Sequence, residues 1–357
     1  MNPDAADKSP AAGQRLEARR VTFVYTLFHH LGDFVVMSGL LRKFDLLEVE
    51  FESLIVHQNS PHVPLFAGKT EGRFFNVATL GGFLALLRKL RRQKKEGRII
   101  FGLPMATGSI QAHFFFQFLK KLGALTYIVD FNLINADIIT PPRRRYIFDR
   151  HLAQAAELLK HPDWLDDTVM PLGIACDASE KNRAVSRIGF YPESARAWLP
   201  EFQWPESRWL ELAETILKNP RCEIALIGRD NVFSELEKLF RLRLPKEMHS
   251  HFVSLPCTSV GEMVQALQSL DFLVTVNTSA LHVAHALKIP LVALCGSSLE
   301  VWRPEGDHVR IVPDTEAPLP PSDKYGHDSL QPSLQHIGVA EVHEAFLDLA
   351  KNFPIKS

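Results

Sequence analysis

Long hydrophobic runs, clustered cysteines and an excess of one charge are all missing from this 357-residue sequence. No apolar stretch reaches the roughly 20 residues that a transmembrane helix needs. The four cysteines lie far apart and form no Cys-x-x-Cys pair, which argues against a disulfide framework and a cysteine-based zinc site. The formal net charge of −1 argues against a general nucleic-acid binder. What remains is the composition of a globular protein, 46% hydrophobic and 23% charged.

The amino-terminal segment also lacks a hydrophobic core. Residues 1–20 are rich in Ala, Pro and charged residues, so they predict a disordered tail and no signal peptide. Together with the isolated cysteines, this favours a cytoplasmic protein. Fifteen histidines are present, but the pair His282 and His285 has no third ligand at local spacing, so we expect no metal site.

One stretch near the carboxyl end predicts a strand–helix–strand unit of a parallel sheet. An apolar run at 272–276 precedes a helical pattern at 280–288, which Pro290 ends, and a second apolar run follows at 291–295. Parallel strands need such a crossover helix, so the pattern indicates an α/β fold.

Small polar residues follow both of these strands. Thr278 and Ser279 stand at the helix start, where a side-chain oxygen can cap the helix. Free N–H groups and the helix dipole there suit a phosphate, and the turn of Gly296 and Ser297 lies on the same carboxyl edge. The unit therefore predicts a phosphate-bearing ligand, although many such units bind no nucleotide.

A second candidate site follows the first predicted strand, residues 21–27. Gly32 permits a tight turn into a helix predicted at 34–44, and Asp33 stands at the start of that helix. Asp33 has two compatible interpretations, because a helix-capping carboxylate can also act as a general base toward a bound ligand.

Two successive α/β blocks predict two domains. We expect a tail at 1–20, a first Rossmann-like domain at 21–165 and a linker at 166–185. A second Rossmann-like domain is expected at 186–338, followed by a terminal helix at 339–357.

Several motifs resemble those of the ADP-heptose:lipopolysaccharide heptosyltransferases, glycosyltransferase family 9. They are Leu-Gly-Asp33 before an apolar helix, the eleven residues from Asn277 to Leu287, the Pro290 to Ser298 segment and Trp302-Arg-Pro304. Three positions depart from the family pattern: Asn277 replaces an Asp, Ser279 or Ala280 stands where the family has a Gly, and Phe202 replaces a Lys.

The resemblance implies the GT-B architecture, in which two Rossmann-like domains face a central cleft and the last helix crosses back to the first domain. It also implies an inverting transfer of heptose from ADP-heptose to the lipopolysaccharide core or a related glycan, with Asp33 as general base and no cofactor or metal. The expected donor-binding residues are Ser194, Arg196, Gly228, Asn277, Thr278, Ser279, His282, Gly296 and Ser297. Arg196 would replace the missing Lys as a cation for the donor phosphates, but it is equally consistent with an exposed loop.

Two basic segments stay open to two interpretations. Arg143, Arg144 and Arg145 suit acceptor phosphates or a plain surface. The run at 88–95 suits a solvated helix end or contact with anionic lipid at the inner face of a membrane. The departures at Asn277 and Phe202 leave two alternatives to heptosyl transfer: another reaction or donor, such as sugar-nucleotide epimerisation, and a nucleotide-sugar binder without turnover.

Overall fold

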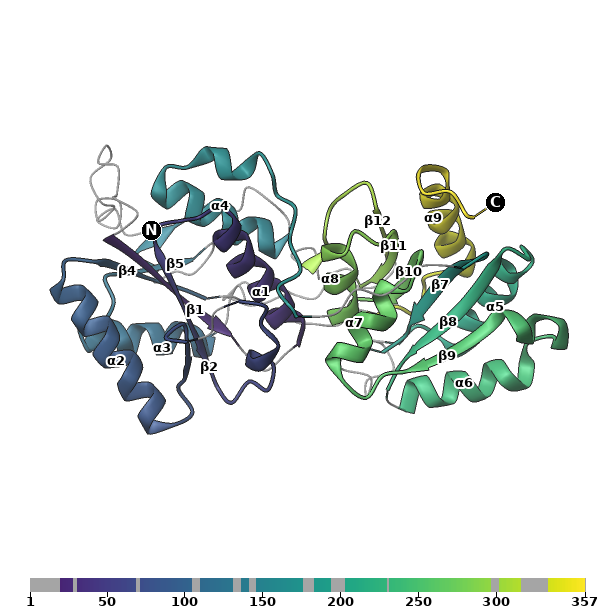
Figure 1. Cartoon of the computed structure of the whole chain (residues 1–357), viewed down its shortest axis with the longest axis horizontal. Helices are drawn as coiled ribbons and strands as arrows, with labels where there is room; N and C mark the ends of the chain where they lie inside the picture. Colours follow the sequence, from purple (N-terminus) through teal and green to yellow (C-terminus); the bar gives the residue numbers. More distant parts are fainter. Residues whose placement is uncertain are drawn as a thin grey trace. The chain divides into compact units, whose positions relative to one another are not determined.

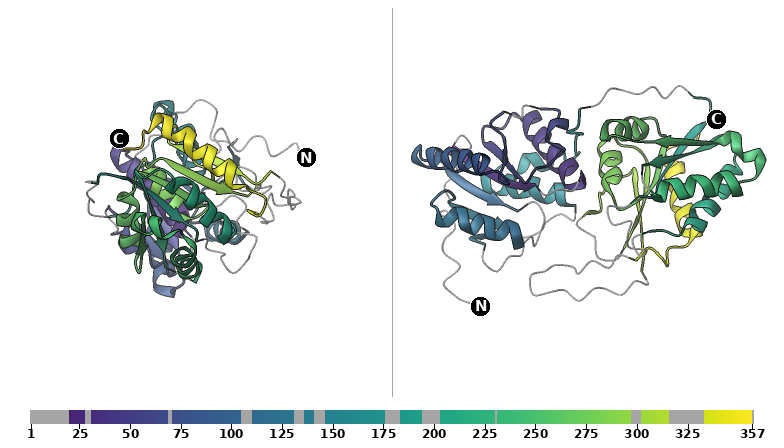
Figure 2. Two further views of the ribbon diagram at one scale, coloured as in Figure 1. Left: turned by 90° about the vertical axis from the view of Figure 1, so that its right-hand side faces the viewer. Right: turned by 90° about the horizontal axis from the view of Figure 1, so that it is seen from below.

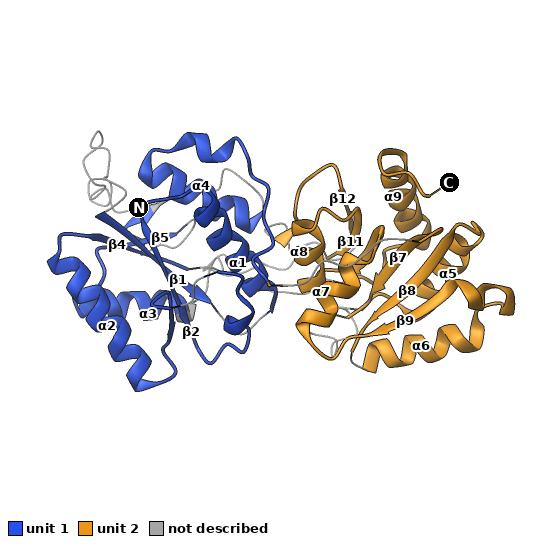
Figure 3. Ribbon diagram, in the orientation of Figure 1, with its two compact units in different colours: residues 1–174, 322–327 blue, residues 175–321, 328–357 orange. Residues whose placement is uncertain are grey.

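The computed structural model divides the chain into two compact units, which are coloured separately in Figure 3. Unit 1 runs to Ile174 and unit 2 begins at Ala175. The structure describes residues 20–27, 31–68, 71–104, 110–130, 136–140, 146–175, 183–193, 203–229, 231–296, 302–315 and 333–356.

Unit 1 is a parallel sheet with helices on both faces (Figure 1). Within the described residues its sheet has six strands in the order β3-β2-β1-β4-β5-β6. The strands are β1 (Val21–Leu27), β2 (Glu52–His57), β3 (Phe74–Asn76), β4 (Ile99–Leu103), β5 (Tyr127–Asp130) and β6 (Ile138–Ile139). The helices are α1 (Leu31–Leu46), α2 (Leu80–Lys95), α3 (Ile110–Lys121) and α4 (Ile147–Leu159), with 3-10 turns at Val63–Leu65 and Pro162–Leu165.

The core of unit 1 forms because its central strands are apolar on both sides. All seven residues of β1 are buried, as expected for a strand that helices cover on both faces. On one face, Leu86 and Leu90 of α2 and Phe116 of α3 belong to the same buried cluster as Val24. On the other face, α1 contacts α4.

Unit 2 repeats this design. Within its described residues a second sheet has six parallel strands in the order β12-β11-β10-β7-β8-β9. The strands are β7 (Ser186–Tyr191), β8 (Cys222–Gly228), β9 (Phe252–Pro256), β10 (Phe272–Val276), β11 (Leu291–Cys295) and β12 (Val309–Pro313). The helices are α5 (Glu206–Leu217), α6 (Asn231–Arg243), α7 (Val260–Gln268), α8 (Ser279–Ala286) and α9 (Val339–Asn352), with a 3-10 turn at Lys246–His251. The predicted fold class, two parallel α/β domains, is confirmed.

The terminal helix differs from its expected place. Residues 339–357 were expected to cross back to the first domain, but α9 contacts α5, β11 and β12 of unit 2, and Figure 2 shows it beside those strands. The reason is its apolar face, since Phe346 is buried and its ring lies 5.1 Å from that of Phe272. The preceding segment is also held in unit 2, because the Trp204 indole donates to the Ile337 carbonyl over 2.8 Å.

The expected linker is partly built into unit 1. Gly173 lies so close to Ser38 of α1 that a Cβ there would stand 2.2 Å from the Ser38 carbonyl carbon. Ile174 forms an antiparallel bridge with Phe66, and Met170 is buried. The stretch from 166 to 174 therefore packs as part of the first unit.

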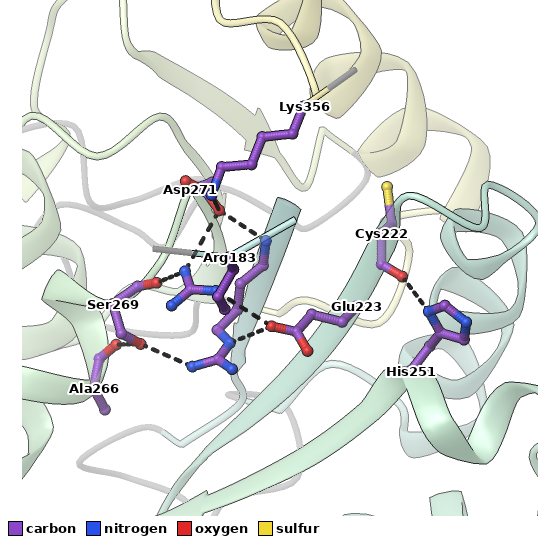
Figure 4. A network of polar contacts seen from close by, with 9 residues as sticks. Arg183, Cys222, Glu223, His251, Ala266, Ser269, Asp271 and Lys356 are labelled. Carbon is purple, nitrogen blue, oxygen red and sulfur yellow. Dashed lines mark hydrogen bonds and ion pairs between the residues drawn. The ribbon is translucent and has the colours of Figure 1, made fainter. Parts of the chain in front are cut away.

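A network of charges joins three strands of unit 2 at their amino ends (Figure 4). The Asp271 carboxylate accepts a hydrogen bond from the Arg187 backbone over 2.9 Å and lies 3.5 Å from the Arg183 guanidinium. Arg187 also donates to Glu223 over 2.6 Å. Lys356, near the chain's end, lies 3.4 Å from the same Asp271 carboxylate. The edge opposite the candidate site is thus tied together by ion pairs.

Candidate active site

The strand order predicts where each unit binds a ligand. In unit 1 the order reverses between β1 and β4, and in unit 2 it reverses between β7 and β10. Ligands of such sheets bind outside the carboxyl ends of the strands at that reversal. The residues after β1, β7 and β10 are therefore the first to consider.

Asp33 lies at the reversal point of unit 1. It follows β1 and falls in the first turn of α1, which begins at Leu31 and therefore starts earlier than the predicted residue 34. The next residues of α1, from Phe34 to Leu41, are buried in the core, which fixes the helix against the sheet. Asp33 itself is half-buried, so its carboxylate stands at the border between core and solvent.

The surroundings of Asp33 favour its neutral form. Burial raises the pKa of its carboxyl group to about 7, because the ionised form loses hydration. At neutral pH the side chain can therefore take up and release a proton readily. A carboxylate poised in this way is suited to general base catalysis.

The turn between β10 and α8 presents small polar groups. Asn277, Thr278 and Ser279 are all partly exposed, while the residues on either side of them are buried. Thr278 is the N-cap residue, but its side chain accepts no hydrogen bond from the helix. Of the two capping side chains that the sequence allowed, Thr278 or Ser279, Thr278 takes the N-cap position without a capping hydrogen bond from its hydroxyl.

Gly296 follows the neighbouring strand β11. Its carbonyl accepts a hydrogen bond from the Arg303 guanidinium over 2.7 Å. The sheet register pairs Val276 with Leu294, so the turns after β10 and β11 lie side by side. Arg303 is thereby held near the polar turn, although sequence reasoning gave it no role. The Trp302-Arg-Pro304 motif was the signal that pointed to it.

His282 lies inside α8 and cannot serve as a cation. Burial lowers the pKa of its imidazole to about 4, so the ring is neutral at physiological pH. Its ring centroid lies 5.9 Å from that of Trp302. The neutral ring can contribute a hydrogen bond, and Arg303 supplies a positive charge at this edge.

Gly228 has a packing role at the end of β8. A Cβ there would stand 2.5 Å from the Glu193 carboxylate and 2.9 Å from Phe233. Glu193, which follows β7 and is buried, accepts a hydrogen bond from the Arg229 backbone. Sequence reasoning missed this buried carboxylate, which lies at the reversal point of unit 2.

A comparison with protein families matches residues 149–325 to glycosyltransferase family 9 (heptosyltransferase). The matched range contains the β10–α8 turn, Gly296 and Arg303. These residues form a glycosyltransferase family 9 domain. No curated protein matched in a separate sequence search.

Solved structures support the same fold for this family 9 glycosyltransferase. A family 9 protein from Veillonella parvula superposes with a TM-score of 0.60 at 16% identity, over 95% of this chain and all of that one. ADP-heptose lps heptosyltransferase II of E. coli gives 0.59 at 18% identity, over 93% and 98% of the two chains. E. coli heptosyltransferase WaaC with ADP gives 0.59 at 14% identity, over 92% and 100%. At these identities the likeness establishes the GT-B fold.

Some expected site residues of this glycosyltransferase lie outside the described residues. They are Arg143, Arg144, Arg145, Ser194, Arg196 and Ser297. Those that the structure does describe gather at two carboxyl edges: Asp33 in unit 1, and Gly228, Asn277, Thr278, Ser279, His282 and Gly296 in unit 2. In the part of the chain that the structure covers, no three His, Cys, Asp or Glu side chains are grouped to hold a metal ion.

Proposed function

We propose that this protein transfers heptose, with inversion, from ADP-heptose to the lipopolysaccharide core or a related glycan. Membership of family 9 supports glycosyl transfer, and two similar structures carry heptosyltransferase names. The observation that carries the catalytic assignment is Asp33, half-buried in the first turn of α1 at the reversal point of unit 1, with a pKa of about 7.

In this reaction the Asp33 carboxylate accepts the proton of the acceptor hydroxyl. The hydroxyl oxygen attacks the anomeric carbon while the bond from that carbon to the diphosphate oxygen breaks, and ADP leaves. Attack opposite the leaving group inverts the configuration. General base catalysis of this kind supplies typically 10²–10⁴-fold in rate.

Unit 2 would hold the donor at the turns after β10 and β11. The hydroxyls of Thr278 and Ser279, together with the amino end of α8, suit the diphosphate, and Arg303 supplies a positive charge beside Gly296. A diphosphate leaving group stabilised in this way requires no metal ion. Turnover should therefore survive treatment with EDTA.

Donor choice is tested first by thermal unfolding with ADP-, UDP- and GDP-sugars and their free nucleotides. A ligand at 100 times its dissociation constant stabilises the folded state by about 2.7 kcal/mol. A shift that is selective for ADP compounds supports the ADP-heptose assignment. A shift with UDP or GDP compounds alone overturns the donor and leaves the reaction class intact.

The catalytic assignment is tested with Asp33→Asn in a transfer assay. We expect kcat/KM to fall by roughly 10²–10⁴-fold while the donor dissociation constant stays unchanged. Glu48→Gln, an exposed position just after α1, is the matched control and should keep full activity. Full activity of Asp33→Asn would remove Asp33 from the mechanism.

A binder of nucleotide sugar without turnover is the second candidate. The observation that favours it is Asn277, which can donate and accept hydrogen bonds but carries no charge at the position where the family pattern has Asp. Selective donor binding without product from any tested acceptor, in the wild type and in Asn277→Asp alike, would favour this candidate.

A further inference from the structure

Helix α3 exposes two large apolar side chains. Phe114 is 68% exposed and Phe118 is 49% exposed, and they are four residues apart on one side of the helix. The opposite side of α3 provides the core residues Phe116 and Leu119. Neither Phe114 nor Phe118 belongs to that buried cluster, so both rings leave apolar surface exposed on α3.

Helix α2 brings a concentration of positive charge. Its sequence, LGGFLALLRKLRRQKK, contains six Lys or Arg residues and no acidic residue. Three of the six bind other groups of unit 1. Lys89 pairs with Glu52, Arg91 donates to the Leu122 carbonyl and Lys94 donates to the Leu125 carbonyl.

The remaining cations of α2 stay at the surface. Arg88 and Lys95 are exposed, and Arg92 lies 3.7 Å from Glu96 in an exposed pair. On α3, Lys121 is exposed one turn after Phe118. Arg88, Lys95 and Lys121 thus add three exposed positive charges, and among the printed ion pairs of α2 the exposed acidic partner is Glu96.

The two helices lie side by side, so these features share one surface. The Phe83 ring of α2 stacks on the Phe118 ring of α3, with centroids 6.1 Å apart. The bond from Arg91 to the Leu122 carbonyl, 3.2 Å long, joins their carboxyl-terminal ends. We call this surface the α2–α3 face, and it comprises Leu80, Arg88, Lys95, Phe114, Phe118 and Lys121. Leu80, at the start of α2, is 74% exposed.

We propose that the α2–α3 face docks the protein on an anionic lipid bilayer. Phe114 and Phe118 enter the interface between headgroups and acyl chains, and the three exposed cations contact lipid phosphates. The positive charge favours a membrane as the partner, because a surface of apolar rings among cations complements a negatively charged membrane surface. Docking in this manner uses no helix that spans the bilayer, which agrees with the finding that none of the described helices has the length and apolarity for a span.

Co-sedimentation of the full chain with vesicles tests this inference. We expect binding to vesicles of phosphatidylcholine with added phosphatidylglycerol, weak binding to phosphatidylcholine alone, and loss of binding as salt rises. Removing two cations with Arg88→Gln and Lys95→Gln should lower the partition coefficient by about 30-fold. Phe114→Ser tests the apolar part separately, and it suits this purpose because the ring contributes little to the core.

A matched control is available on α6 in unit 2. Leu242 is 77% exposed and is followed by exposed Arg243, so Leu242→Ser with Arg243→Gln removes a similar apolar and basic pair. This double variant should bind vesicles like the wild type. Thermal unfolding of every variant checks that the fold is retained.

Three outcomes would overturn the proposal. The first is a wild-type protein that does not bind the anionic vesicles. The second is equal binding by the wild type and the α2–α3 variants, which would assign docking to another surface. The third is a dimer in analytical ultracentrifugation that Phe114→Ser abolishes without any effect on vesicle binding, because the face would then hold a second copy of the chain.

Discussion

Asp33 stands where ionisation of its side chain costs free energy. The folded protein raises the pKa of this carboxyl group to about 7, whereas an unfolded chain has an Asp pKa of about 3.9. The native state therefore binds the proton more tightly than the unfolded state between these values. As pH rises through that window, the contribution of Asp33 to folding stability falls.

Replacement of Asp33 should expose this cost directly. We expect Asp33→Asn to match the wild type in stability near pH 4 and to be more stable at pH 8, by as much as roughly 4 kcal/mol for a shift of about three units. Urea unfolding at a series of pH values measures the difference. A gap between the two proteins that stays constant with pH would contradict the raised pKa.

Two histidines of α8 change the folding stability with pH in the opposite direction. Burial lowers the pKa of His282 to about 4 and that of His285 to about 3, against about 6.5 in an unfolded chain. The unfolded state therefore binds more protons as pH falls below about 6.5. Stability contributed by the neutral rings is complete above that pH and is lost progressively as pH falls toward 4.

This linkage predicts acid sensitivity that a single substitution reduces. Between pH 6.5 and pH 4, His282 alone should remove up to about 3 kcal/mol of stability. His282→Gln should show a shallower fall in unfolding free energy over the same window, whatever its stability at pH 7. Parallel curves for the two proteins would show that His282 is not buried in its neutral form.

Single residues differ in how far the sequence could predict them. Asp33 and the Asn277 to Ser279 turn could be predicted because each follows an apolar strand, and such positions meet at the carboxyl edge of a parallel sheet. The raised pKa of Asp33 could not be predicted from the sequence, because it depends on burial by residues that are remote in sequence. Glu193 was missed for the same reason, because only the fold brings it against Gly228.

Helices and strands were predictable where they are long and patterned. The α5 pattern, with Trp209, Leu212 and Ile216 on one face, matches the buried face in the structure. The edge strand β9 was not predicted because it is five residues long and only partly buried, so it lacks a continuous apolar run. The three-residue strand β3 was missed on the same grounds.

Helix α9 permits a sharp test of its packing. Phe346 is 2% exposed, and its replacement by Ala should lower the unfolding free energy by roughly 3–5 kcal/mol. The adjacent Leu347 is 45% exposed, so Leu347→Ala should change that free energy by no more than about 0.5 kcal/mol. Urea unfolding followed by tryptophan fluorescence measures both. Equal effects would mean that α9 does not pack on unit 2 through this face.

The molecule as a whole uses one strand order twice. All described strands of each sheet come from one unit. The described contacts of α9 place this helix against the second sheet. The sequence could predict two successive α/β blocks from the alternation of strands and helices. It could not predict that residues 166–174 belong to the first unit, because their packing depends on Gly39 and Gly173 fitting closely against other segments.

This division predicts a localised response to nucleotide. If the turns after β10 and β11 hold the donor, saturating ADP should slow hydrogen exchange in peptides around Thr278 and Gly296. Peptides from α2 and β2 in unit 1 should exchange at unchanged rates. Hydrogen exchange measured by mass spectrometry tests this prediction. Protection confined to peptides of unit 1 would contradict it, because the nucleotide would then bind away from the turns after β10 and β11.

The ion pairs around Asp271 have a consequence for the connectivity of unit 2. Arg183, near the start of that unit, and Lys356, near its end, both lie within 3.5 Å of one carboxylate. The two ends of the unit are therefore close together in space, on the edge opposite the candidate donor turns. Neighbouring termini are the condition under which circular permutation is tolerated. A short peptide could thus join the two ends of unit 2 and new ends could be opened elsewhere, which would change the order of the strands along the chain while the candidate donor turns keep their arrangement.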